Sequence, residues 1–357
     1  MPNFDRPRVI VDASPLRYLH TGLGQFSYHL LHELSVIPTP HYHLEALVHP
    51  RYQSLVPQGI QVKAASWLRR HAPQRIQPYM YGQCRVWHMT TENTRLTGTP
   101  TKAALVLTIH GLHFLDEETP SVAEHKLRGV QALVNQAEVI TAVSQHTATL
   151  VRQTLDVRNK TIRVIPNGIS FSGSTGLPPA WAPQKKFLFS VGTFFERKNL
   201  HVLIPMMKLL PEFTLILAGD FHHDYGTKVL DLIRAQEMGG QIITPGEISD
   251  VEKNWLYENG EALVFPSVSE GFGIPLLEAF HHGKPVFCSR FGSLPEVGKT
   301  YAYYWDDFQP EHMASLVAAK LRAAATEEQA ERRKYAGQFS WSVTAGAYHE
   351  IYTALLN

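Results

Sequence analysis

The sequence predicts an α/β protein made of two doubly wound, Rossmann-like parallel-sheet domains in tandem. The chain has 357 residues, about the length of two ordinary domains. Short apolar runs alternate with helix-like stretches, a pattern typical of parallel sheets that carry helices on both faces. A segment rich in Pro, Gly and Ser, residues 170–184, interrupts the alternation and predicts a linker between the two domains.

The first half of the alternation predicts an N-terminal domain over residues 1–170. The expected strands are Arg8–Ala13, Leu44–Val48, Ala104–Ile109, Val139–Val143 and Ile162–Ile165. Apolar periodicity indicates helices over Gln25–Leu34 and Ala123–Glu138. In such sheets the carboxyl ends of all strands meet at one edge, where ligands bind. We therefore expect functional residues directly after the strands.

The pattern restarts after the linker and predicts a C-terminal domain over residues 185–340. The expected strands are Phe187–Val191, Phe213–Ala218, Gln241–Ile243, Ala262–Phe265 and Pro285–Ser289. The expected helices are Leu200–Leu210, Lys228–Glu237, Pro275–His282, one long Ala-rich helix over Ala314–Arg333, and Trp341–Leu356. With two such domains facing each other, the cleft between them is the expected ligand site.

Composition and short motifs exclude several classes of protein. No apolar run approaches the roughly 20 residues of a membrane-spanning helix, and the N-terminus has no signal-peptide pattern, so we expect a cytoplasmic protein. Cys84 and Cys288 form no CxxC pair, which argues against a disulfide framework and a structural zinc site. Despite 19 histidines there is no HExxH or Asp-x-Asp motif, and we expect no metal.

The charge is distributed unevenly along the chain. Residues 1–170 hold 17 basic and 11 acidic residues, a net charge of +6, and the remainder of the chain carries −5. Between Arg51 and Lys102 there are eight basic residues and one acid, Glu92. An anionic membrane surface or a lipid-linked saccharide suits this stretch, and a solvated basic face is the alternative. No nucleic-acid motif accompanies it, so nucleic acid is not expected.

The densest motif runs from Phe265 to Glu278. A strand is followed by a loop with Gly271 and Gly273, and Pro275 marks the start of a helix. The first N–H groups of a helix form a ready anion site. Glu270 in the loop and Glu278, expected in the first helical turn, would flank that site and accept hydrogen bonds from sugar hydroxyls. The alternative is that these two acids only complement the helix dipole or are solvated.

Three further features lie at expected strand ends. Arg197 and Lys198 follow the strand 187–191, where fixed cations could stabilise a negative charge without a metal. His110 directly follows the strand 104–109. Gly22 and Gly24 could form a backbone cradle for a phosphate. They do not form a dinucleotide fingerprint, because Ser27 stands where a third Gly or Ala is required.

Glu270 and Glu278, spaced as E-x7-E within SEGFGIPLLEAFHHGKPV, resemble the signature of retaining glycosyltransferases of family 4, which have the GT-B fold. Five other segments resemble elements of that family in the family's order: Thr21–Gly24, Thr108–His110, Thr141–Ser144, Val164–Ile169 and Ser190–Asn199. The resemblance covers most of the chain. The Val-Gly-Thr…Glu-Arg-Lys-Asn variant is similar to a subgroup rich in mannosyltransferases of bacterial surface polysaccharides.

The resemblance implies a retaining, metal-independent enzyme that moves a sugar, first of all mannose from GDP-mannose, to a saccharide or lipid-linked acceptor. The C-terminal domain would hold the donor. The N-terminal domain would recognise the acceptor, with the helix at about residues 341–357 packed back on it. Glu270 would position sugar hydroxyls, Glu278 the ribose, Arg197 and Lys198 the diphosphate, and His110 the transferred sugar. The other implied donor-binding residues are Gly22, Gly24, Gly192, Thr193, Gly271, Phe272, Gly273, Ile274 and Pro275. No cofactor besides the donor substrate is implied.

The sequence departs from the family pattern at two positions. Thr193 stands where many relatives have an arginine, so the diphosphate would depend more on Arg197 and Lys198. Gly111 stands where relatives often have an aspartate, so another group must orient His110. Two alternatives to a transferase remain: a catalytically silent, sugar-nucleotide-binding regulatory subunit and a GT-B nucleotide-sugar epimerase.

Overall fold

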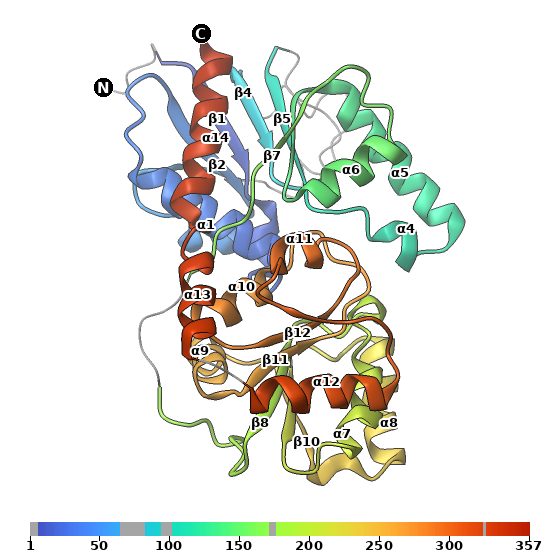
Figure 1. Cartoon of the computed structure of the whole chain (residues 1–357). Coiled ribbons are helices and arrows are strands. Elements are labelled where there is room, and N and C mark those ends of the chain that lie inside the picture. The colour runs from blue at the N-terminus through green and yellow to red at the C-terminus, as the bar shows by residue number, and fades with distance from the viewer. Residues whose placement is uncertain (1–5, 65–82, 94–101, 171–175, 324–325) are drawn as a thin grey trace. The chain divides into compact units, whose positions relative to one another are not determined.

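The computed structural model describes residues 6–64, 83–93, 102–170, 176–323 and 326–357. The chain divides into two compact units (Figure 1). Unit 1 comprises Met1–Gly168 and Ser340–Asn357, and unit 2 is the continuous segment Ile169–Phe339. Each unit is built on a parallel sheet with the topology of a Rossmann-like domain. The predicted fold class is therefore confirmed.

Unit 1 contains a seven-stranded parallel sheet in the order β3-β2-β1-β4-β5-β6-β7. Its strands are β1 (Arg8–Asp12), β2 (His43–Val48), β3 (Gln61–Ala64), β4 (Val86–Met89), β5 (Ala104–Ile109), β6 (Ala137–Ala142) and β7 (Ile162–Val164). The sequence did not predict β3 and β4. Each has four residues, and β4 carries the polar His88, so neither forms an apolar run.

Helices cover both faces of this sheet. They are η1 (Ser14–Tyr18), α1 (Gly22–Val36), η2 (Pro50–Leu55), α4 (Phe114–Glu117), α5 (Pro120–Gln136), α6 (Gln145–Thr154) and α14 (Trp341–Leu356). Side chains of β1 alternate between the two faces. Val9 and Val11 pack in the core formed with α1 and α14, and Ile10 packs in the core formed with α5 and α6. The helix α14 lies beside α1, so the last residues of the chain complete unit 1 (Figure 1).

A buried polar network attaches α14 to the middle of the sheet. His88 in β4 bonds to the Tyr352 hydroxyl through Nδ1 at 2.6 Å and to the Thr108 hydroxyl through Nε2 at 2.8 Å. The Tyr348 hydroxyl lies 2.8 Å from Thr108 Oγ1 and 3.0 Å from Thr141 Oγ1. Burial lowers the pKa of His88 to about 3, so its ring is neutral at ordinary pH. These directional bonds fix the position of α14 more narrowly than apolar contact alone.

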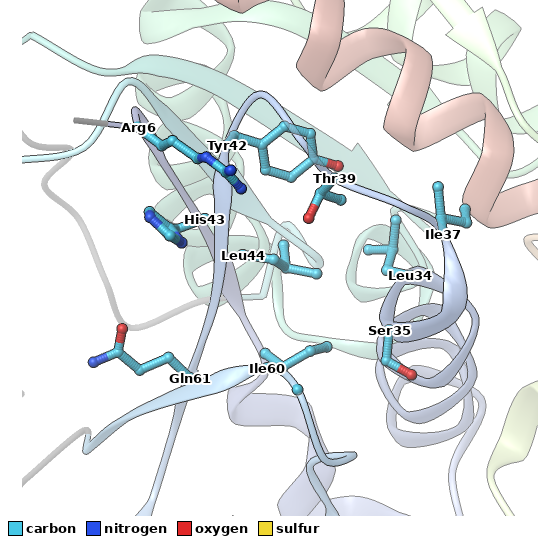
Figure 2. A pocket seen from close by; sticks show the side chains of 11 residues that line it. Arg6, Leu34, Ser35, Ile37, Thr39, Tyr42, His43, Leu44, Ile60 and Gln61 are labelled. Carbon is cyan, nitrogen blue, oxygen red and sulfur yellow. The ribbon is translucent and has the colours of Figure 1, made fainter. Parts of the chain in front are cut away.

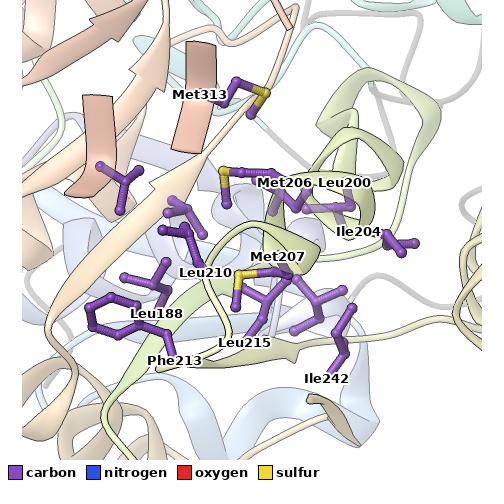
Figure 3. Close-up of a cluster of buried hydrophobic side chains, with 14 of the residues drawn as sticks. Leu188, Leu200, Ile204, Met206, Met207, Leu210, Phe213, Leu215, Ile242 and Met313 are labelled. Carbon is purple, nitrogen blue, oxygen red and sulfur yellow. The ribbon is translucent and has the colours of Figure 1, made fainter. Parts of the chain in front are cut away.

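Unit 2 contains a six-stranded parallel sheet in the order β10-β9-β8-β11-β12-β13. Its strands are β8 (Phe187–Val191), β9 (Thr214–Ala218), β10 (Ile242–Gly246), β11 (Ala262–Phe265), β12 (Val286–Ser289) and β13 (Tyr303–Trp305). Its helices are η3 (Glu196–Lys198), η4 (Leu200–Val202), α7 (Leu203–Lys208), α8 (Asp224–Ala235), η5 (Met238–Gly240), α9 (Asp250–Asn259), α10 (Ile274–His281), α11 (Leu294–Gly298), α12 (Pro310–Arg322) and α13 (Thr326–Ala336). Side chains of α7, β8 and β9 form a buried apolar cluster with Met313 of α12 (Figure 3).

The predicted single helix over Ala314–Arg333 is wrong, because two helices occupy this stretch. α12 ends at Arg322 with Lys320 also in its last turn, and α13 begins at Thr326, which is followed by Glu327 and Glu328. Cations favour the end of a helix, whereas threonine and carboxylates favour its beginning. The run of alanines hid this boundary in the sequence.

Candidate functional site

The order of the strands indicates where each unit binds a ligand. The order reverses between β1 and β4 in unit 1 and between β8 and β11 in unit 2. Ligands of open α/β sheets bind at the carboxyl ends of the strands at such a reversal. His110 follows β5 beside this point in unit 1, Arg197 and Lys198 follow β8, and Glu270 follows β11. All four therefore lie at the edge where the topology places a ligand.

In unit 2, the structure brings Arg197, Lys198 and Glu270 together. Arg197 Nη1 lies 3.3 Å and Lys198 Nζ 2.6 Å from the same carboxylate oxygen, Glu270 Oε1. Ser267 Oγ donates a hydrogen bond to this oxygen at 2.6 Å. The side chains of the three charged residues are only 11–17% exposed. The alternative of a solvated cation pair is therefore wrong.

Hydrogen bonds from the chain join the two loops that carry this cluster. The Val268 N–H donates to the Arg197 carbonyl at 2.8 Å, and Ser267 Oγ, whose proton is directed mainly at Glu270, lies 3.0 Å from the same carbonyl oxygen. Ser293 Oγ lies 3.0 Å from the Glu270 carbonyl oxygen and 2.7 Å from the Phe272 carbonyl oxygen, and its single proton is shared between them. These bonds within the protein hold the two loops, and with them the charged groups, in place, as electrostatic preorganisation requires.

The charge state of the cluster follows from its contacts. Burial alone would raise the pKa of Glu270, but the attraction of Lys198 and Arg197 and the hydrogen bonds to its carboxylate lower that pKa to about 2. The carboxylate is thus ionised at neutral pH and cannot act as a general acid there. Two cations and one carboxylate leave a net charge of +1, which suits an anionic ligand.

The glycines beside the cluster have backbone conformations that favour glycine. Gly192 has φ +135° and Gly273 has φ +102°. A Cβ at Gly192 would lie 3.7 Å from Lys198 Cε, so this glycine is adjacent to the cation pair. Thr193 follows Gly192 in the loop after β8. Gly271 and the buried Phe272 precede Gly273, and Ile274 and Pro275 are the first two residues of α10.

Glu278 lies elsewhere than expected. Because α10 begins at Ile274, Glu278 is in its second turn and not in its first. Its carboxylate accepts hydrogen bonds from Lys253 Nζ at 3.0 Å and from the Tyr257 hydroxyl at 2.6 Å. The attraction of Glu278 raises the pKa of Lys253, and burial raises that of Tyr257. A ribose at Glu278 would share the carboxylate with these two side chains.

In unit 1, Gly22 and Gly24 belong to the first turn of α1 and do not form a loop. Thr21 precedes the helix, and its hydroxyl accepts a hydrogen bond from the Gly24 N–H at 3.3 Å. The Gly24 N–H, which was expected to bind a phosphate, therefore already has Thr21 as an acceptor within the protein. A Cβ at Gly24 would lie 2.1 Å from the Tyr18 carbonyl oxygen, whereas a Cβ at Gly22 would meet nothing within 4 Å.

His110 has partners that sequence reasoning missed. Its ring Nε2 lies 2.9 Å from the Thr90 carbonyl, and its backbone N–H donates to Glu92 Oε2 at 2.9 Å. The His110 ring also packs edge-on against the Phe26 ring, with the two ring centroids 4.7 Å apart. Glu92 is 5% exposed, although the sequence showed it only as the single acid of a basic stretch. The buried strand β4 ends shortly before Glu92, and recognising this strand would have placed Glu92 at a strand end.

The basic stretch between residues 51 and 102 lies partly outside the described residues. Arg69, Arg70, Arg75 and Arg95 are among the residues that the structure does not describe. Lys63 is described, and its Nζ lies 3.4 Å from the buried Glu45 carboxylate. This cation therefore has an internal partner, and the number available to an external surface is smaller than eight.

Three observations limit other kinds of site. A cavity of about 160 Å³ in unit 1 lies at the beginning of β2 and β3, lined by His43 and Gln61 among others, away from the carboxyl ends of the strands (Figure 2). Among the described residues, no group of His, Cys, Asp or Glu side chains could hold a metal ion. None of the described helices is long and apolar enough to cross a membrane.

Two family models match the sequence. A model of group 1 glycosyl transferases matches residues 178–338, and a model of glycosyltransferase family 4 matches residues 32–172. The chain is 28% identical over 244 residues to the serotype-specific mannosyltransferase WbdA of Escherichia coli, covering 62% of this chain and 29% of WbdA. It is 33% identical over 159 residues to the O-antigen chain mannosyltransferase B of Escherichia coli, covering 42% and 41% of the two chains. The chain thus spans less than half the length of these relatives.

Solved structures show the same fold at low sequence identity. Sucrose-phosphate synthase from Thermosynechococcus elongatus matches with a TM-score of 0.76 and 17% identity, over 98% of this chain and 99% of that one. HepE of Anabaena in complex with UDP-glucose matches with a TM-score of 0.75 and 16% identity, over 98% and 100% of the two chains. WaaG, a glycosyltransferase involved in lipopolysaccharide biosynthesis, has a TM-score of 0.67.

Proposed function

The chain belongs to family 4 of the glycosyltransferases and has their GT-B fold, and from this premise we propose that it is a retaining, metal-independent hexosyltransferase. Its donor is a nucleotide diphosphate sugar, in the first place GDP-mannose. Its acceptor is a saccharide or a lipid-linked saccharide in the synthesis of a surface polysaccharide. The similarity to WbdA and to O-antigen chain mannosyltransferase B supports mannose and this class of product.

The observation that carries the proposal is the cluster of Arg197, Lys198 and Glu270 at the strand reversal of unit 2. Two cations 2.6 and 3.3 Å from one buried carboxylate oxygen form a preorganised site for a group whose negative charge grows during the reaction. A leaving nucleoside diphosphate is such a group. The pair supplies charge that a metal ion would otherwise supply, and it supports a reaction without one.

The bond between the anomeric carbon of the sugar and the diphosphate oxygen breaks, and a bond from the acceptor oxygen to the same face of that carbon forms. The acceptor proton passes to the leaving diphosphate oxygen, while Arg197 and Lys198 stabilise the charge that develops there. Glu270 remains an anion, because its pKa is about 2, and it accepts hydrogen bonds from hydroxyls of the transferred sugar.

A thermal-shift panel tests the donor. UDP-, GDP-, ADP- and CDP-sugars are added to the full chain at matched concentrations. A ligand at 100 times its Kd should add roughly 2.7 kcal/mol to the free energy of unfolding. GDP-mannose is expected to give the largest shift, and the Arg197→Gln/Lys198→Gln double variant is expected to reduce it. Equal shifts in wild type and double variant would contradict the assigned donor site.

The same protein preparations distinguish the transferase from the two alternatives, a silent regulatory subunit and a nucleotide-sugar epimerase. A transferase releases nucleoside diphosphate when an acceptor is added and keeps its activity in EDTA. A silent regulatory subunit binds the sugar nucleotide without releasing product, and an epimerase converts the sugar while it remains bound to the nucleotide. Restoration of activity by magnesium or manganese after chelation would contradict the metal-independent reaction.

We also propose that the chain works in the cytoplasm on the inner face of the membrane, through the basic residues between positions 51 and 102. Each cation near an anionic leaflet contributes up to about 1 kcal/mol, and screening confines this attraction to a Debye length of about 8–10 Å, so added salt should release the chain. Liposome co-sedimentation at low and high salt tests this with an Arg69→Gln/Arg70→Gln/Arg75→Gln variant. Equal pelleting of variant and wild type would leave the stretch as a solvated face.

A further inference from the structure

The loop after β4, residues 90–93, holds His110 at two points. The Thr90 carbonyl contacts ring Nε2 at 2.9 Å, and Glu92 Oε2 accepts the His110 backbone N–H at 2.9 Å. Because a carbonyl oxygen can only accept, Nε2 must carry the ring proton. Burial lowers the pKa of His110 to about 4, so the ring is neutral. Its Nδ1 therefore carries a lone pair that can accept a hydrogen bond.

The same loop is joined to other elements around the strand reversal of unit 1. Thr90 Oγ1 donates to the Asp12 carbonyl at the end of β1 at 2.6 Å and lies 3.2 Å from Ser27 Oγ in α1. Asn93 Nδ2 donates to Glu92 Oε1 at 3.0 Å. The Glu92 carboxyl group is thus bonded to the loop at one oxygen and to the end of β5 at the other.

Gly111 supplies no carboxylate beside His110, and a side chain at this position would require the His113 ring to move. A Cβ at Gly111 would lie 2.7 Å from His113 Nε2, so a side chain there would displace the His113 ring. Glu92, in the loop after β4, supplies a carboxylate there instead. It accepts a hydrogen bond from the backbone N–H of His110, at the carboxyl end of the central strands of the sheet.

We propose that Glu92 is a positioning residue for His110: its carboxyl group fixes the backbone of His110 and the loop 90–93, and thereby the ring orientation in which Nδ1 accepts a hydroxyl of the transferred sugar. This inference rests on the proposed function only where it names a sugar hydroxyl as the partner of Nδ1. The positioning itself is a property of the free protein. Among the described residues, the titratable groups at the same edge include Asp12 at the end of β1, the neutral His110 at the end of β5, and His113 shortly after it.

The ionisation of Glu92 provides a direct readout of this contact. Burial raises its pKa to about 7, against the opposing hydrogen bond from the His110 N–H. The chemical shift of the His110 amide proton should therefore titrate with a midpoint near pH 7 in the labelled full chain. Glu92→Gln, which keeps an acceptor but cannot ionise, should abolish this titration. Glu45→Gln, at another buried carboxylate of unit 1, should leave it unchanged.

The ring is examined in the same samples. Long-range nitrogen–proton spectra should show His110 as the single neutral tautomer protonated at Nε2 in wild type and Glu92→Gln, and as an average of tautomers in Glu92→Leu. With GDP-mannose as donor, Glu92→Leu should lower kcat at least tenfold and change the donor KM less than twofold. Glu92→Gln should restore most of the turnover and flatten its pH profile near 7.

Two results would overturn the proposal. One is a His110 amide that does not titrate, or that titrates identically in Glu92→Gln. The other is an unchanged His110 tautomer in Glu92→Leu. If Glu92→Leu fails to fold, the amide titration of wild type against Glu92→Gln still decides. Failure of the donor assay alone contradicts the assigned donor and not the role of Glu92, since the spectra need no substrate.

Discussion

Arg197 and Lys198 contact the same carboxylate oxygen of Glu270, and both are predicted to act mainly in the transition state. Lys198 Nζ lies 2.6 Å from Glu270 Oε1, compared with 3.3 Å for Arg197 Nη1. Charge on the leaving diphosphate grows toward the transition state. Replacing either cation with Ala should therefore lower kcat by about 10²–10³ and weaken donor binding much less.

Steady-state kinetics and calorimetry on the same preparations measure the two quantities. Lys228→Ala is the matched control. This lysine is exposed, and its Nζ lies as far as 4.0 Å from the carboxylate of the exposed Glu196, so the variant should behave as wild type. A variant of Arg197 or Lys198 that loses donor affinity in proportion to turnover would contradict a role specific to the transition state.

Glu278 is predicted to contribute to both folding and nucleotide binding. Glu278→Ala leaves the Tyr257 hydroxyl and the mostly buried Lys253 without their acceptor, and should reduce the free energy of unfolding by about 2–3 kcal/mol. If Glu278 binds the ribose, nucleotide affinity should also fall by about 1.5–3 kcal/mol. Tyr257→Phe keeps the carboxylate, so it should lose about 1 kcal/mol of stability and no affinity. Unchanged nucleotide affinity in folded Glu278→Ala would remove the ribose role.

Glu92 should make the stability of the protein depend on pH. Its pKa in the folded protein is about 7, above the usual 4.5, so the folded state binds more protons between these values. The free energy of unfolding therefore falls as pH rises through this window, by up to about 3 kcal/mol. Glu92→Gln should gain stability relative to wild type at pH 8 and not at pH 4. Chemical denaturation at the two pH values measures the difference.

The residues of the site divide according to whether a short motif marks them in the sequence. The cluster of Arg197, Lys198 and Glu270 could be anticipated because each lies in a short motif after an expected strand, whereas Glu278 lies in the second turn of α10 and not in the first. Glu92 could not be anticipated, since its role depends on a hydrogen bond to a residue 18 positions away and on β4, which no apolar run marks. The pairing of Glu278 with Lys253 depends likewise on the packing of α9 against α10.

At the scale of elements, the start of α1 contains two glycines with different surroundings. Gly24 lies against the η1 backbone, where a Cβ would be 2.1 Å from the Tyr18 carbonyl oxygen, and Gly22 is open. Gly24→Ala should destabilise unit 1 severely, whereas Gly22→Ala should fold at least as well as wild type, because alanine favours helix. Thermal unfolding of both variants checks this difference.

The matched pair also tests the expected phosphate cradle. If the first turn of α1 approaches a phosphate closely, Gly22→Ala should weaken donor binding while its unfolding temperature stays at or above that of wild type. Wild-type donor affinity in Gly22→Ala would show that the turn serves packing alone. Gly24→Ala cannot decide the question, since its fold is expected to change.

Elements with a strong apolar run or a clear helical period could be predicted, and short or interrupted ones could not. The strands β1, β5, β8 and β9 were expected almost to the residue, because they are buried on both faces. The strands β3, β4 and β13 have three or four residues and contain polar or half-buried side chains. Their place in the sheet comes from pairing with neighbours, which is a property of the tertiary fold.

At the scale of the whole molecule, the two units differ in how the chain builds them. Unit 2 is one continuous segment, Ile169–Phe339, with its own six-stranded sheet and apolar core. Unit 1 needs two segments, because α14 supplies Tyr348 and Tyr352 to its buried network. This difference determines which part of the chain can fold by itself.

We therefore predict that a fragment of residues 169–339 folds alone and binds the donor nucleotide. It contains Arg197, Lys198, Glu270 and Glu278 together with every hydrogen bond described among them. Calorimetry with GDP should give an affinity within about tenfold of the full chain, a difference of about 1.4 kcal/mol that bounds any contribution of unit 1. A fragment of residues 1–168, in contrast, should not fold, since without α14 the buried polar groups of His88 and Thr141 lose their tyrosine partners. Adding a peptide of residues 340–357 should restore it. A folded 169–339 fragment without affinity for any nucleotide would place the binding energy in unit 1 and contradict the assignment of the donor to unit 2.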